Sequence, residues 1–449
     1  MTIDRVLYGT LLCLVFTLPL LWGGNRNPVW LAYAALTFGM IALAALCVGV
    51  EQWRLCWQRY RVALLLLAAW LAANLLQLIP WPGGAISQDV FTSSVTTVQS
   101  FFYAGLFLLA ALLLTRPSRL RWLAMAMLLA GFAQAMFGSL MTLSGVEWLL
   151  LEPKRYGIGY ATGTFVNRNH YAGLLVTCLA LGVGLLLGQA GSRRSGQGFS
   201  RRARDLLRWM LGPAMRLRLM LVVMVIGLVL SRSRMGNGAF FAALLLTALL
   251  ALIVIRPMPK KILVLLSTLL IIDIALVGTW FGFEQVVERL QGTGQYDSLA
   301  RVSADSDRLN ISAETWRAAK DFLWLGSGGG TFEQIFPAYR PVDLRKFFDH
   351  AHNDYLEFLL EYGVIGLLPL GGWIVGAWIA AFRAMRERRN RLMKGLGFSV
   401  VMAMLAGAMQ GTVDFNLHIP ACAAYFTLVL ALGYAALYIP TVSGKTVKI

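Results

Sequence analysis

Residues 349–363 read DHAHNDYLEFLLEYG, and a strongly apolar segment follows directly. The stretch therefore joins a polar, titratable segment to a hydrophobic one. It holds two of the four histidines of the chain, His350 and His352. The other two, His170 and His418, also border apolar segments. Polar clusters in such positions are where function is expected in a chain made mostly of hydrocarbon.

The composition indicates a membrane protein. Of the 449 residues, 58% are hydrophobic and only 14% are charged, and the mean hydropathy is +0.65. Apolar runs long enough to cross a bilayer of about 30 Å recur from end to end. The fold class predicted is an all-α polytopic membrane protein with about twelve transmembrane helices. The spans are expected at 7–23, 28–49, 61–79, 100–115, 119–143, 169–189, 219–231, 238–255, 262–281, 363–382, 395–413 and 421–438.

Lys and Arg residues set the predicted orientation. Alternate connections between spans are basic, and one of them carries eight arginines between Arg193 and Arg218. Because short cytoplasmic loops are enriched in Lys and Arg, these connections and both termini are expected in the cytoplasm. All four histidines then fall on the opposite, external side.

The chain is expected to divide into three parts. Residues 1–281 hold the first nine spans, residues 282–362 form a large external loop, and residues 363–449 hold three spans and a tail. The loop is long enough to fold as a small helical cap. Ser312–Phe322 and the histidine stretch itself are expected to be helical, with a Gly-rich turn at 326–330 between them.

Several classes of partner and cofactor are not expected. The net charge of +18 does not indicate nucleic-acid binding, because the basic residues lie in short clusters between apolar runs. The five cysteines show no metal-ligand spacing. His350 and His352 are two residues apart, unlike the i,i+4 pair of a helical zinc site. Neither a metal nor another cofactor is predicted.

Two arginines interrupt what would otherwise be a tight external hairpin. Residues 231–238 read SRSRMGNG and contain Arg232 and Arg234. A guanidinium keeps its charge and offers a planar fork that suits phosphate. An anion site is therefore favoured. The alternative is that each arginine snorkels to the membrane surface.

Residues 163–173 read GTFVNRNHYAG and place Asn167, Arg168, Asn169 and His170 at the outer end of the sixth span. These side chains suit sugar hydroxyls or a phosphate, and the alternative is a capped helix start. In the large loop, Arg308 lies among charged residues and is either an anion ligand or half of a surface ion pair.

The histidine stretch offers a general base. His350 and Asp354 are four apart, so on a helix they would pair with each other. His352 has no such partner in the sequence and lies beside Asn353. Histidine titrates near neutral pH and can take a proton from a hydroxyl nucleophile. His418, in the short segment 414–420, either lines the same cavity or belongs to a helix break.

Taken together, segments 163–173, 231–236, 326–330 and 350–356 resemble the O-antigen ligase/polymerase superfamily. The resemblance covers roughly residues 160–430. It implies a metal-independent glycosyl transfer on the periplasmic face of the bacterial inner membrane, within a fold similar to lipid-donor glycosyltransferases. The donor would be a glycan on undecaprenyl pyrophosphate, and the acceptor another glycan or lipid A core. In-line attack by this route would invert the anomeric centre.

The resemblance also implies roles for particular residues. Arg234 and Arg308 would engage the pyrophosphate, with Arg232 beside them, and His352 would be the base because Asn353 and Leu356 follow it in the family spacing. The remaining candidates for substrate binding are Arg168, Asn167, Asn169, His170, His350, Asn353, Tyr355 and His418.

Two alternatives stay open. A transporter or channel for a small anion or glycan would also use many spans, and intramembrane charge marks substrate pathways. Asp273, midway along the ninth span, has no assigned role in either interpretation. Within the enzyme interpretation, the acceptor can be a second lipid-linked repeat, lipid A core or a protein serine. These correspond to a polymerase, a ligase and a protein O-oligosaccharyltransferase.

Overall fold

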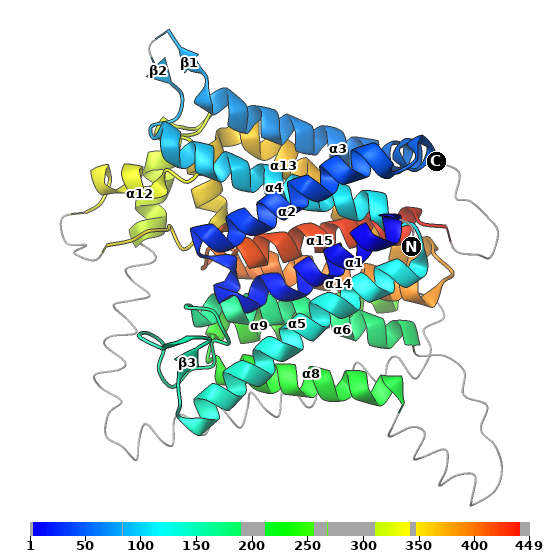
Figure 1. The fold of residues 1–449 in the computed structure, drawn as a ribbon. Coiled ribbons are helices and arrows are strands. Elements are labelled where there is room, and N and C mark those ends of the chain that lie inside the picture. Colours follow the sequence, from blue (N-terminus) through cyan, green and yellow to red (C-terminus); the bar gives the residue numbers. More distant parts are fainter. Residues whose placement is uncertain are drawn as a thin grey trace, which may run out of the picture.

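The computed structural model confirms an all-α membrane architecture (Figure 1). Within the described part of the chain, ten helices are long and apolar enough to cross a bilayer. The residues that the structure describes are 3–82, 84–189, 212–255, 267, 310–341 and 347–440.

The described residues form eleven long helices. They are α1 (Ile3–Thr17), α2 (Asn27–Cys47), α3 (Val50–Leu78), α4 (Val90–Leu113), α5 (Pro117–Ser144), α6 (Arg168–Gln189), α8 (Pro213–Leu230), α9 (Arg234–Val254), α13 (Asp354–Glu387), α14 (Arg391–Gln410) and α15 (Pro420–Tyr438). Short helical turns are η1 (Leu18–Leu20), η2 (Trp22–Gly24), α12 (Phe332–Ile335), η3 (Phe336–Ala338) and η4 (Asn416–His418).

Local sequence signals explain where several helices begin. The side chains of Asp89, Ser233, Asn353 and Asn390 accept hydrogen bonds from the first backbone amides of α4, α9, α13 and α14. Such caps satisfy amides that have no partner within the helix. Proline opens α5, α8 and α15, where its missing N–H costs nothing.

Within the described residues, the span prediction holds for most helices and differs at one boundary. Helix α8 covers the expected seventh span and packs on α5 and α6. The expected ninth span, 262–281 with Asp273, lies outside the described residues except for position 267. Helix α13 runs across the boundary predicted at residue 363, although Gly363 interrupts its helical geometry with φ 60°.

The expected helix over the histidine stretch is wrong for its first part. Residues 350–353 are not helical, and α13 begins at Asp354. The reason is Asn353, whose side chain accepts from the amides of Tyr355 and Leu356 and so starts the helix there. In contrast, residues 310–321 are helical, close to the helix expected at Ser312–Phe322.

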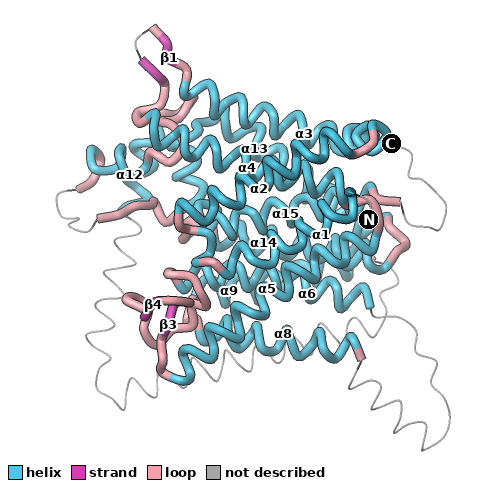
Figure 2. Tube along the Cα trace, viewed as in Figure 1, coloured by secondary structure: helices cyan, strands magenta, loops and turns pink. Residues whose placement is uncertain are grey.

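The two ends of the bundle differ (Figures 1 and 2). One end carries α12 and two small antiparallel hairpins, formed by β1 (Pro80–Trp81) with β2 (Gly84–Ala85) and by β3 (Trp148–Leu149) with β4 (Glu152–Pro153). At the opposite end, Arg119 at the start of α5 pairs with Asp4 of α1. There too, Arg388 donates to the carbonyls of Leu437 and Ile439 at the end of α15. The described starts and ends of the chain therefore lie together, as expected if both termini share one side.

Helices α6 and α15 form the centre of the bundle, and most of their residues are buried. Helix α6 packs closely on α14 where Gly184 meets Gly395 and Ser399. A Cβ added at Gly184 would collide with the Gly395 carbonyl oxygen and the Ser399 hydroxyl. Small residues let helix backbones approach in this way inside membranes.

We expect Gly184→Ala to destabilise the protein, because the added methyl group forces α6 and α14 apart. Overpacking of this kind costs about 1–3 kcal/mol. The measurement is the apparent Tm of purified protein in detergent. Gly371→Ala is the matched control, since a Cβ at Gly371 meets nothing within 4 Å, and its Tm should stay at the wild-type value. Equal Tm values for the two variants would contradict this account of the helix contact.

Candidate active site

Three carboxylates on the first turns of α13 form one wall of the site. Asp354, Glu357 and Glu361 are spaced at i, i+3 and i+7, so they share one face of the helix. Their exposed fractions are 4%, 0% and 1%. Buried carboxylates are costly unless paired or hydrogen-bonded, so their partners define what the site is.

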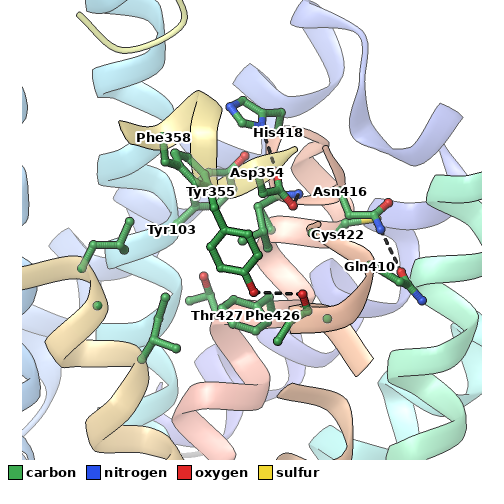
Figure 3. A pocket seen from close by; sticks show the side chains of 18 of the residues that line it. Tyr103, Asp354, Tyr355, Phe358, Gln410, Asn416, His418, Cys422, Phe426 and Thr427 are labelled. Carbon is green, nitrogen blue, oxygen red and sulfur yellow. Dashed lines mark hydrogen bonds and ion pairs between the residues drawn. The ribbon is translucent and has the colours of Figure 1, made fainter. Parts of the chain in front are cut away.

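Those partners are histidines. The Nδ1 atom of His350 donates to Glu357 Oε1 at 2.6 Å. His418 lies on the other side of Glu357, with Nε2 3.3 Å from Oε1. The same ring reaches Asp354 Oδ1 through Nδ1 at 3.2 Å (Figure 3) and lies 3.7 Å from Glu361. The pairing of His350 with Asp354 expected from their i,i+4 spacing is wrong, because His350 precedes the helix.

Aromatic rings hold the histidines in place. Phe415 stacks on His350 with ring centroids 4.1 Å apart, and it meets His170 and His352 edge-on at 4.5 and 5.0 Å. Phe358 stacks on His418 at 4.7 Å. All four histidines of the chain therefore gather around two phenylalanines, although they come from three distant segments.

A buried contact between His170 and Asp414 closes the cluster. His170 Nε2 lies 3.6 Å from Asp414 Oδ1, and both side chains are 6% exposed. Burial raises the pKa of Asp414, but the neighbouring His170, with smaller contributions from the Phe415 amide and His352, outweighs it and leaves this pKa below its ordinary value. Asp414 is therefore charged at neutral pH.

The pKa of His418 shifts in the opposite sense. Burial lowers it, but the charge of Glu357, followed by Asp354 and Glu361, outweighs burial and holds the pKa well above the ordinary 6.5. His418 is thus a buried cation among three carboxylates. Its charge offsets part of the repulsion among these carboxylates.

The Gly-rich turn at residues 326–330 hydrogen-bonds to α13 next to the three carboxylates. At the interruption of α13, the carbonyls of Leu360 and Glu361 accept from the amides of Ser327 and Gly328 at 2.8 and 3.0 Å. Gln77 of α3 donates to the Glu361 carbonyl at 2.7 Å. The turn therefore satisfies backbone groups that a continuous helix would have satisfied itself.

The arginine turn lies beside the start of α6. Arg168 and Arg232 both lie over the ring of Tyr160, at 4.2 and 5.5 Å from its centroid. Arg234 is the first residue of α9 and is exposed. Near it, Gly236 approaches Ala172 of α6 so closely that a Cβ would come within 2.7 Å. Segments 163–173 and 231–238 are thus neighbours, as a common anion site requires.

A cavity of about 940 Å³ opens at the histidine cluster. Its polar end includes His350, Asp354 and His418, and Figure 3 shows the last two of these side chains. Its lining on α13 continues down to Trp378, a length comparable with the hydrocarbon core of a bilayer, about 30 Å. Helices α3, α4, α6, α14 and α15 supply the remaining helical walls, mostly with apolar and aromatic side chains.

The other predicted residues have varied positions. Tyr355 lines the cavity and donates to the carbonyl of Ala408 at 2.9 Å. Asn353 caps α13, and Asn167 accepts from the amide of Asn169 at 2.8 Å at the start of α6, as the capping alternative predicted. His352 has φ 51° and is not among the cavity-lining residues. Arg308 lies outside the described residues.

The sequence interpretation missed Glu357, Glu361 and Asp414 as members of the site. The sequence contained part of this signal. Glu357 and Glu361 are four residues apart in an otherwise apolar helix start, so they share one face of the helix. Among the described residues, His350, Glu357 and His418 have potential ligand atoms within 4.8 Å of one another, which is close enough to hold a metal ion. The direct hydrogen bond between His350 and Glu357 satisfies both groups without one.

The fold and the site together define a multi-span membrane protein with a buried histidine–carboxylate cluster at one end of an apolar cavity. Residues 219–371 match the family described as O-Antigen ligase. The matched region contains the arginine turn, the Gly-rich turn and His350–His352. The match supports membership in the O-antigen ligase/polymerase superfamily and, in general terms, a glycan-processing function. No curated protein matches the sequence significantly.

We expect His418→Gln to lower the Tm, because it leaves three buried carboxylates without their cation. Removing one partner of a buried ion pair costs about 3–5 kcal/mol. The raised pKa makes the stabilisation by His418 complete below about pH 6.5 and lost as the pH rises through the folded-state pKa. The Tm difference between wild type and variant should therefore be largest near pH 6 and shrink in alkaline buffer. A difference that grows with pH would contradict this assignment of charge.

Proposed function

We propose that the protein transfers a glycan from undecaprenyl pyrophosphate to an acceptor hydroxyl at the periplasmic face of the inner membrane. The observation that carries the proposal is the cavity beside α13, which joins a polar, titratable mouth to a long apolar interior. A donor with a reactive glycosyl pyrophosphate and a long polyprenyl tail has the same two-part chemistry. The family match supports the same class of substrate.

The arginine turn is the proposed pyrophosphate site. Arg232 and Arg234 flank Ser233, and Arg168 shares Tyr160 with Arg232. Guanidinium groups stabilise the charge that develops on a departing pyrophosphate, which is the task a metal ion performs in other transferases. Arg308 is proposed to join them from the large loop.

The proposed reaction needs a proton acceptor and a leaving group. A histidine of the cluster takes the proton of the acceptor hydroxyl, whose oxygen attacks C1 of the donor sugar. The bond from C1 to the pyrophosphate oxygen breaks, and lipid pyrophosphate leaves with the electron pair. Attack from the side opposite the leaving group inverts the anomeric centre.

Arg234→Ala is expected to reduce transfer by about 100-fold, the loss typical of removing one charge-stabilising donor. The assay combines purified protein, a lipid-pyrophosphate oligosaccharide, an acceptor and EDTA. Arg155→Ala, an exposed arginine between β4 and α6, is the matched control and should transfer at the wild-type rate. The size of the product distinguishes a polymerase from a single transfer to lipid A core or to protein. Wild-type inactivity with all donors, together with glycan flux in proteoliposomes, would overturn the proposal in favour of transport.

Gly407→Trp should obstruct the proposed tail site. Gly407 lines the cavity, and a Cβ there meets only Phe426, at 3.9 Å. The variant should raise the KM of the full-length polyprenyl donor about tenfold, equivalent to about 1.4 kcal/mol of binding, and affect a short-prenyl donor less. Gly39→Trp on the exposed side of α2 serves as the control. Equal effects on both donors would show that the tail binds elsewhere.

A further inference from the structure

The four histidines are not equivalent in their access to the cavity. His350 and His418 line it, whereas His352 does not. The side chain of His350 is 26% exposed, while that of His418 is 12% exposed and surrounded by three carboxylates. An incoming hydroxyl therefore meets His350 first.

The ring of His350 is fixed at one nitrogen and one face. Its Nδ1–H donates to Glu357, whose second oxygen accepts from the Ala351 amide at 2.8 Å. Phe415 stacks on the ring at an interplanar angle of 18°. With Nδ1 protonated and bonded to a buried carboxylate, the neutral ring carries its lone pair on Nε2. This is the geometry of an oriented general base.

His352 is placed differently. It adopts φ 51°, a backbone conformation that non-glycine residues seldom take. Its ring meets Phe415 and Phe348 edge-on, at 5.0 and 6.4 Å. Its charge also acts on Asp414, on the side of the cluster where His170 lies. These contacts give His352 a role in holding the segment 414–418.

We propose that His350, oriented by Glu357, is the group that takes the acceptor proton, and that His418 is a positioning residue that holds Glu357. This inference rests on the proposed glycosyl transfer. The acceptor O–H bond breaks and its proton moves to Nε2 of His350, while the oxygen forms the bond to C1 and lipid pyrophosphate departs. His350 then returns the proton to water or to the released pyrophosphate, so the protein is unchanged.

Several carboxylates lie around His350. Glu357 faces it directly, and Asp354 and Glu361 from α13 are linked through His418. Asp414, paired with His170 and close to His352, faces the other side of Phe415. The proton gained by His350 thus enters a group rich in carboxylates, which stabilises the transition state electrostatically.

The test compares His350→Gln, His352→Gln and Glu357→Gln in the transfer assay, with donor KM and kcat measured from pH 5 to 9. His350→Gln should lower kcat by about 100-fold or more with little change in donor KM, and this loss should exceed that of His352→Gln at least tenfold. Glu357→Gln should lower kcat and move the acidic limb of the pH–rate profile to lower pH, because the base is then protonated less readily. Glu387→Gln, at the far end of α13, is the matched control.

His350→Ala with added imidazole distinguishes a misfolded variant from one that lacks only the general base. If the fold is intact, imidazole should restore part of the transfer rate. A larger kcat loss in His352→Gln, or an unshifted profile in Glu357→Gln, would overturn the inference while leaving glycosyl transfer intact. A stoichiometric metal ion in the wild type that disappears in Glu357→Gln, with inhibition by EDTA, would also overturn it. Failure of the wild type to transfer would instead count against the proposed function.

Discussion

The interruption of α13 at Gly363 is the constraint on which the site depends. A Cβ at this position would come within 2.5 Å of the Trp324 carbonyl oxygen, so only glycine lets the turn approach. In return, the amides of Val364 and Ile365 donate to the carbonyls of Leu323 and Trp324. The broken helix and the segment that contains Leu323 and Trp324 therefore satisfy each other's backbone groups, and these hydrogen bonds position the first turns of α13 beside the cavity.

Electrostatics explains why so many side chains converge there. Asp354, Glu357 and Glu361 are buried where the effective dielectric is low and unpaired charge is costly. His418 offsets part of this charge, and the hydrogen bond from His350 satisfies an oxygen of Glu357. The surrounding aromatic rings exclude water and fix the geometry without adding competing hydrogen bonds.

Much of this organisation could be predicted from the sequence, and the remainder could not for identifiable reasons. Hydropathy and charge placed all four histidines on one side, and the structure gathers them. Asn353 could have been recognised as a helix cap, which would have excluded the i,i+4 pairing of His350 with Asp354. The stacking of Phe415 on His350 could not be foreseen, because it joins residues 65 positions apart through a tertiary contact.

The match at residues 219–371 covers only part of this cluster. The groups inside and outside the matched region have different proposed tasks. Within it lie the arginine turn, the broken helix and the His350–Glu357 pair, which are the groups proposed to handle pyrophosphate and proton. His170, Phe415 and His418 come from outside it, yet they orient the same rings. A pair such as His350 and Glu357 keeps a fixed geometry only if a third surface prevents the ring from rotating, and here Phe415 is that surface. The proposed chemistry therefore requires α6 and the α14–α15 connection as much as the matched region itself.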